Sequence, residues 1–105
     1  MPEEPAAEEI RRWHRWMAVE LFNRTWRLLE SERGPDEDRE LLASALASWL
    51  HWRRVGEPAN FAVSDWQVAR VCTVLGDTAR AEEYAWSSLR VAQDHHLGAF
   101  YVGYA

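Results

Sequence analysis

Apolar residues recur at helical spacing in four blocks of this chain, and glycine or proline residues separate each block from the next. The blocks cover residues 6–30, 37–54, 59–75 and 78–95, and in each the apolar side chains lie three or four positions apart. No segment alternates apolar and polar residues as a half-buried strand does. Because the connections are short, consecutive helices should run antiparallel. The pattern predicts an all-α fold of antiparallel helical hairpins.

Residues at the ends of the blocks indicate where the helices begin and end. Asp36 is expected to be the N-cap of the second helix. Gly76 followed by Asp77 predicts a C-terminal glycine and then the N-cap of the fourth helix. Gly98 is expected to end that helix, and residues 99–105 look like the opening of a fifth one.

The apolar residues of the first block fall on one half of the helix surface, which we expect to be buried. They are Ile10, Trp13, His14, Met17, Ala18, Leu21, Phe22, Thr25, Leu28 and Leu29. This arc is wider than one neighbouring helix can cover. Together with the aromatic C-terminal segment, Phe100, Tyr101 and Tyr104, it predicts a homodimer that uses the first helix or that segment.

The third block carries two apolar stripes, so its helix should lie between two neighbours or line a groove. One stripe contains Phe61, Val68, Ala69, Cys72 and Leu75, and the other contains Val63, Trp66, Arg70 and Val74. Seven tryptophans are a large number for a chain of this length. Because tryptophan carries the largest apolar side chain, we expect about two thirds of them in the core.

Length and composition limit the class of protein. The 105 residues, 48% apolar and 28% charged, predict a single domain over residues 1–105, or the N-terminal part of a longer helical array. A single cysteine suits the reducing cytoplasm, and no apolar run is long enough to span a membrane. The net charge of −5 is spread evenly, which argues against a nucleic-acid surface or an anionic-membrane patch.

The stretch from Ala62 to Leu89 resembles a tetratricopeptide repeat, a pair of antiparallel helices. The matching positions are Val68, Ala69, Cys72, Gly76, Asp77, Ala81, Tyr84 and Leu89. The stretch departs from the repeat at Asp65, where an aromatic residue is usual and Trp66 follows one place later, and no proline closes the unit. The small residues would let the two helices approach closely.

Most of residues 22–100 look like a bacterial family of tetratricopeptide-like proteins. The residues that carry this resemblance include Trp26, Leu28, Leu29, Ala43, Ala45, Ser48, His51, Trp52, Val55, Gly56, Asp65, Trp66, Arg70, Val71, Leu75 and Gly76. It implies a tetratricopeptide-like helical bundle and no particular activity.

The chain offers little for catalysis. It contains no lysine, which excludes Schiff-base and P-loop chemistry. No histidine has a second metal ligand three or four residues before it on the same helix face. Cys72 lies in an apolar stripe, and no serine occupies a nucleophile turn. We therefore expect no catalytic residues, no metal and no cofactor.

The resemblance to the repeat implies a concave inner face on the third helix. Placing Gly76 on the turn glycine of the repeat puts four residues there, and His51 is a further candidate. The four are Val63, Trp66, Arg70 and Thr73. These residues indicate a groove for a protein or peptide segment, or alternatively a surface that another helix or a second subunit covers.

We therefore predict a non-enzymatic protein–protein interaction module or self-associating scaffold. The alternative is a small helical enzyme or ligand binder with a pocket near His51, Asp65 and Arg70. Arg70 distinguishes the readings, since it either faces a partner or pairs internally with Asp65 or Glu20.

Overall fold

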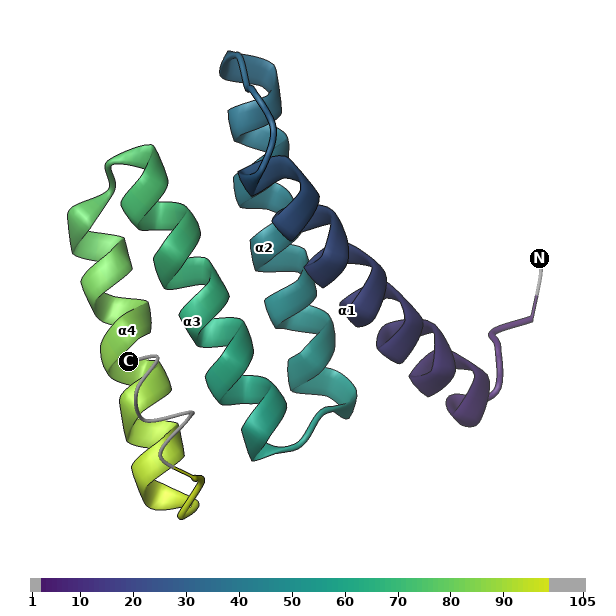
Figure 1. Ribbon diagram of the computed structural model, residues 1–105. Helices are drawn as coiled ribbons and strands as arrows, with labels where there is room; N and C mark the ends of the chain where they lie inside the picture. The colour runs from purple at the N-terminus through teal and green to yellow at the C-terminus, as the bar shows by residue number, and fades with distance from the viewer. Residues whose placement is uncertain (1–2, 99–105) are drawn as a thin grey trace.

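The computed structural model describes residues 3–98, and this part of the chain is all-α, with no strand (Figure 1). Its helices are α1 (Ala7–Leu29), α2 (Pro35–Val55), α3 (Pro58–Leu75) and α4 (Thr78–Asp94). They lie in chain order, each running opposite to the one before. The all-α prediction is confirmed, and each described helix begins and ends within two residues of its expected bounds. None of these helices is long and apolar enough to cross a lipid bilayer. The fifth helix expected over 99–105 lies outside the described residues.

Two prolines start the central helices. Pro35 and Pro58 are the first residues of α2 and α3, where the fixed φ of proline suits a helix and its missing N–H costs nothing. The backbone N–H of Gly34 donates to the Glu37 carboxylate at 2.9 Å, which fastens the start of α2. The prediction that Asp36 is the N-cap is wrong, because Pro35 begins the helix earlier and leaves Asp36 inside the first turn.

The connection between α3 and α4 follows the predicted chemistry. Gly76 adopts the left-handed conformation with φ 84°, and the Asp77 carboxylate accepts a backbone N–H from the first turn of α4. The far end of α4 differs from expectation. The helix ends at Asp94, because His96 takes a positive φ of 54° and turns the chain before Gly98 is reached.

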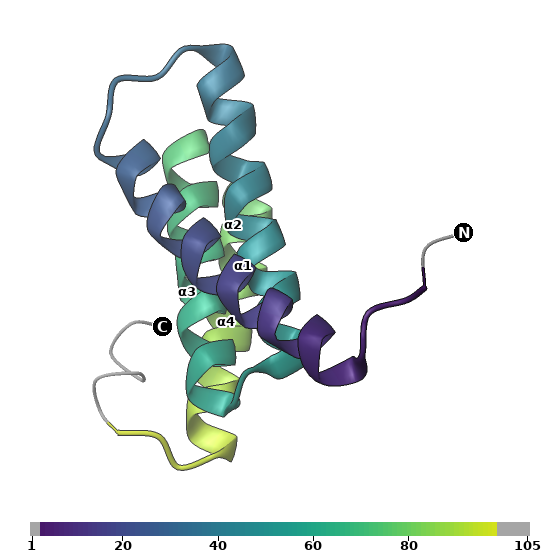
Figure 2. The same ribbon diagram turned by 90° about the vertical axis from the view of Figure 1, so that its right-hand side faces the viewer.

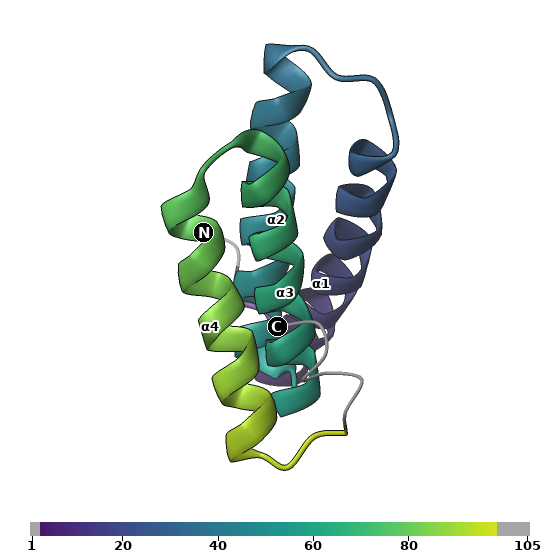
Figure 3. The ribbon, with the colours of Figure 1, turned by 60° about the vertical axis from the view of Figure 1, so that its left-hand side comes forward.

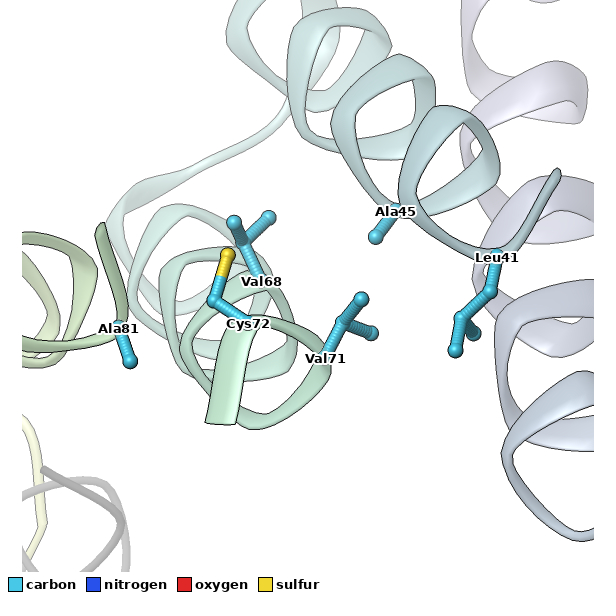
Figure 4. Packing of buried hydrophobic residues seen from close by; sticks show 6 residues of the cluster. All are labelled: Leu41, Ala45, Val68, Val71, Cys72 and Ala81. Atoms are coloured by element: carbon cyan, nitrogen blue, oxygen red, sulfur yellow. The ribbon is translucent and has the colours of Figure 1, made fainter. Parts of the chain in front are cut away.

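The core lies where α3 is held between α2 and α4 (Figure 4). Its buried residues are Leu41 and Ala45 from α2, Val68, Val71 and Cys72 from α3, and Ala81 from α4. Val68 and Cys72 of one predicted stripe enter it, whereas Arg70 and Val74 of the other stripe are exposed. Alanine and cysteine at these contacts keep the helix axes close. The side chains with the largest buried volume therefore come mainly from α3, the central helix.

Polar bonds fasten α1 to the rest of the molecule. The buried Ser48 hydroxyl of α2 donates to the carbonyl of Ala18 at 2.8 Å. The side-chain amide of Gln67, from α3, donates to the carbonyl of Phe22 at 3.0 Å. Both carbonyls belong to the middle of α1, so this part of the helix is held against two neighbours.

The N-terminal part of α1 is much more exposed than its apolar pattern predicts. Ile10 and Trp13 were expected to be buried and are 39% and 56% exposed. At this level of α1 the contact with α2 is made by His14, which lies beside Trp13 in the sequence. In Figure 2, α1 lies in front of the other helices, and its outer side is uncovered. The expectation for the tryptophans is also wrong: none of the seven is fully buried, and Trp13, Trp16 and Trp86 are more than half exposed.

Candidate functional site

Three residues of the predicted groove lie together in a hollow of about 440 Å³ between α3 and α4, which run side by side in Figure 3. They are Trp66, Arg70 and Thr73, which follow one another at helical spacing on α3. The rest of the lining is Ala69 from α3 and Thr78, Ala81, Glu82 and Ala85 from α4. Small side chains on both helices leave this space unfilled.

Arg70 is exposed and makes no ion pair within residues 3–98. The alternative that it pairs with Asp65 or Glu20 is wrong. Asp65 instead pairs with Arg53 at 3.1 Å, and Glu20 lies 3.9 Å from Arg27. The guanidinium of Arg70 is therefore available to a ligand that enters the hollow. Glu82 contributes the opposite charge from the α4 side.

Trp66 joins the hollow to α1. Its ring lies against that of Trp26, with the ring centroids 5.3 Å apart and the planes tilted by 41°. Trp66 is half-buried and lines the hollow. The hydroxyl of Thr73 donates to the carbonyl of Ala69 at 2.9 Å, which leaves its oxygen as an acceptor.

The structure places the other two predicted groove residues elsewhere. Val63 lines a smaller hollow of about 160 Å³, together with Phe22, Trp52, Ala59 and Asn60. His51 lies on α2 and faces α1, where its Nδ1 is 2.8 Å from the Nδ1 of His14. The predicted set of five therefore divides into three groups, of which the Trp66, Arg70 and Thr73 group is the largest.

The contact between His14 and His51 constrains protonation. Two Nδ1 atoms at 2.8 Å can bond only if one ring donates and the other accepts, so at least one Nδ1 must be unprotonated. Burial lowers the pKa of His51, and the nearby His14 and Arg54 lower it further. The neutral imidazole of His51 is therefore favoured in the folded protein.

Asp65 is the centre of a buried polar cluster that joins three helices. Its Oδ1 accepts a bond of 2.7 Å from the indole N–H of Trp49 and one of 3.1 Å from Arg53, and its Oδ2 accepts from the Ser87 hydroxyl at 2.6 Å. The guanidinium carbon of Arg53 also lies 4.6 Å from the ring centres of both Trp49 and Phe61. With its side chain 1% exposed, Asp65 links α2, α3 and α4 and offers no surface to a substrate.

The alternative pocket proposed above would need three residues that in fact lie in three different surroundings. These residues are His51, Asp65 and Arg70. His51 contacts α1, Asp65 is enclosed by its donors, and the hollow that contains Arg70 includes neither of them. That hollow combines a cationic fork, an aromatic surface and a carboxylate on its opposite side. This arrangement suits binding of a polar, partly apolar segment better than acid–base chemistry.

Within residues 3–98 no three His, Cys, Asp or Glu side chains gather as a metal site would need. Cys72 is 1% exposed, and its burial raises the pKa of the thiol. The sulfur therefore acts in the described structure as a small buried apolar group.

Sequence reasoning missed two features of the surface and the core. The first is the pairing of Arg53 with Asp65, although Trp49 and Arg53 lie one helical turn apart and so share a face that could receive a carboxylate. The second is a hollow of about 490 Å³ on α1, lined by Glu9, Arg12, Trp13 and Trp16. Arg11, Arg12 and Arg15 lie next to these tryptophans in the sequence, and this pattern could have indicated an exposed face.

A small all-α fold supports many unrelated functions, so the fold alone assigns none. Comparison of the chain with protein-family models, with curated proteins and with solved structures finds no match.

Proposed function

We propose that the protein is a cytoplasmic, non-enzymatic interaction module with a tetratricopeptide-like arrangement, which binds a segment of a partner protein in the hollow between α3 and α4. The alternating helix directions and the left-handed Gly76 support the arrangement. So do Ala69 and Ala81, small and largely buried residues of α3 and α4. The single buried cysteine is consistent with a reducing compartment.

The observation that carries the proposal is the exposed guanidinium of Arg70, without an ion pair among the described residues, one turn from Trp66. Arginine presents a planar fork that binds a carboxylate through two parallel bonds. Tryptophan presents a rigid apolar surface at low entropic cost. These two residue types dominate the energetics of many protein interfaces.

The lining also limits the partner. The partner segment should place an acidic side chain or a terminal carboxylate at Arg70 and an apolar residue against Trp66. Glu82 repels a second acid on the α4 side and favours a hydrogen-bond donor or a basic residue there. A hollow of about 440 Å³ accommodates only a few side chains, so the recognised segment is short.

A displayed library of random peptides tests this function. Peptides selected on the wild-type protein should be enriched in an acidic residue beside an apolar one. Arg70→Ala should weaken their binding at least tenfold, and Arg70→Lys should recover only part of it because lysine lacks the fork. Arg90→Ala is the matched control, since Arg90 is exposed on α4 away from the hollow and also forms no ion pair within residues 3–98.

Thermal melts of the same variants separate binding from folding. Both arginines are exposed, so neither alanine substitution should move the unfolding free energy by more than about 0.5 kcal/mol. Selected peptides that bind Arg70→Ala as tightly as the wild type would contradict the proposal. A melting temperature that falls by many degrees in Arg70→Ala would show instead that this side chain supports the fold.

A further inference from the structure

The outer side of α1 presents two neighbouring tryptophans to solvent. Trp13 and Trp16 are each 56% exposed, and Val19 beside them is 44% exposed. The two indole rings meet edge to face, with centroids 5.7 Å apart and planes at 89°. This edge-to-face contact favours one arrangement of the two rings and makes them a continuous aromatic surface.

Nothing in the described part of the molecule covers this surface. Ala18, Leu21 and Thr25 form the buried side of α1, and helical spacing places Trp16 on the opposite side of the helix. An apolar patch with charged residues around it is typical of an interaction site. Here Glu9 and Arg12 line the same hollow as the two tryptophans.

The charges along α1 are arranged about Trp16. Four residues before it is Arg12 and four residues after it is Glu20, while Glu8 and Arg24 lie eight residues to either side. At four and at eight residues from Trp16, the positions on its two sides therefore carry opposite charges. Glu20 is only loosely engaged, with a side chain 43% exposed and its nearest cation, Arg27, at 3.9 Å.

This arrangement identifies the partner as a second copy of α1 that runs in the opposite direction. In an antiparallel pair centred on Trp16, Arg12 of one copy lies level with Glu20 of the other, and Glu8 with Arg24, on both sides of the two-fold axis. In a parallel pair each of these residues would meet its own like charge. Residues spaced by four also form the rows that interlock when two helices cross.

We propose that this face of α1 is a homodimer interface in which two copies cross antiparallel about Trp16. The surface is separate from the hollow between α3 and α4, so the inference stands or fails independently of the proposed function. The two tryptophans of each subunit form the apolar centre, and the charged residues select the antiparallel direction. One helix per subunit makes a small interface, below about 1,200 Å², so the dimer dissociates on dilution.

Sedimentation velocity over a range of protein concentrations tests the interface. The wild-type protein should pass from monomer to dimer in the micromolar range. Trp16→Ala should raise the dissociation constant at least tenfold. Trp86→Ala is the matched control, because Trp86 is 57% exposed on α4, away from this face, and its removal should leave the dissociation constant unchanged. Circular dichroism checks that both variants remain helical.

Charge reversal tests the antiparallel direction. Arg12→Glu and Glu20→Arg should each weaken the dimer by about tenfold, because each places two like-charged pairs across the axis. The double variant restores opposite charges and should return to wild-type affinity. Three results would overturn the proposal. They are a chain that stays monomeric at several hundred micromolar, a dissociation constant that Trp16→Ala leaves unchanged, and a double variant that dimerises more weakly than either single variant. Tryptophan-dependent binding to anionic lipid vesicles without dimerisation would also overturn it.

Discussion

Replacing Asp65 by asparagine tests how much its buried cluster contributes to stability. Asparagine has nearly the same volume as aspartate, and its carbonyl oxygen can still accept from Trp49 and Arg53. Its amide nitrogen can still donate to the Ser87 hydroxyl. The substitution removes the negative charge. The Arg53 guanidinium, whose side chain is only 22% exposed, is then left without a counter-charge.

The expected cost follows from this geometry. Removing one partner of a buried ion pair typically lowers the free energy of unfolding by about 3–5 kcal/mol. Because Asp65→Asn keeps some neutral hydrogen bonds and Arg53 keeps its contacts with two aromatic rings, we expect about 3 kcal/mol. Asp65→Ala, which removes all three accepted bonds, should cost about 5 kcal/mol. For a domain of this size, 3 kcal/mol corresponds to a fall of roughly 12–24 °C in melting temperature.

Urea and thermal unfolding, followed by circular dichroism, measure this cost. Asp36→Asn is the matched control, since Asp36 also pairs with an arginine, Arg39 at 3.0 Å, but its side chain is 88% exposed. That control should change the unfolding free energy by less than about 1 kcal/mol. Arg53→Met combined with Asp65→Asn should be less destabilising than the sum of the two single variants, because neither charge is then left alone. A loss below about 1 kcal/mol for Asp65→Asn, or strictly additive variants, would refute the reasoning.

Two further predictions concern the histidine pair and the turn before α4. Folding lowers the pKa of His51 below the ordinary imidazole value of about 6.5. The stability that neutral His51 contributes is therefore complete above that value, and it is lost as the pH falls from there toward the folded pKa. Urea unfolding at pH 8 and pH 5.5 should show a smaller pH effect in His51→Gln than in the wild type, while the exposed His95→Gln keeps the full effect. Gly76→Ala should destabilise the protein by about 1–2 kcal/mol because alanine is strained at φ 84°, although its Cβ would meet no neighbour. Gly98→Ala, at a glycine that is equally open but not left-handed, should be close to neutral in the same denaturation assay.

Local chemistry made the helices predictable from the sequence. Periodic apolar residues, the prolines and Gly76 act within one or two turns of the chain, so the helix bounds follow from short segments. The stripe of the third block that contains Val68 and Cys72 likewise lies in the core, whereas Trp66 and Arg70 of the other stripe line the hollow. Trp66, Arg70 and Thr73 share a hollow for the same reason, because their spacing on one helix places them on one face.

Long-range partners could not be predicted in this way. Asp65 pairs with Arg53 and not with Arg70, although Arg70 is nearer in sequence, because the crossing of α2 and α3 brings Arg53 to the carboxylate. Trp13 belongs to an apolar arc and is nevertheless exposed, because the contact with α2 at this level of α1 is made by the adjacent His14. Periodicity shows that a face is apolar, but whether another helix lies against that face depends on how helices distant in sequence cross.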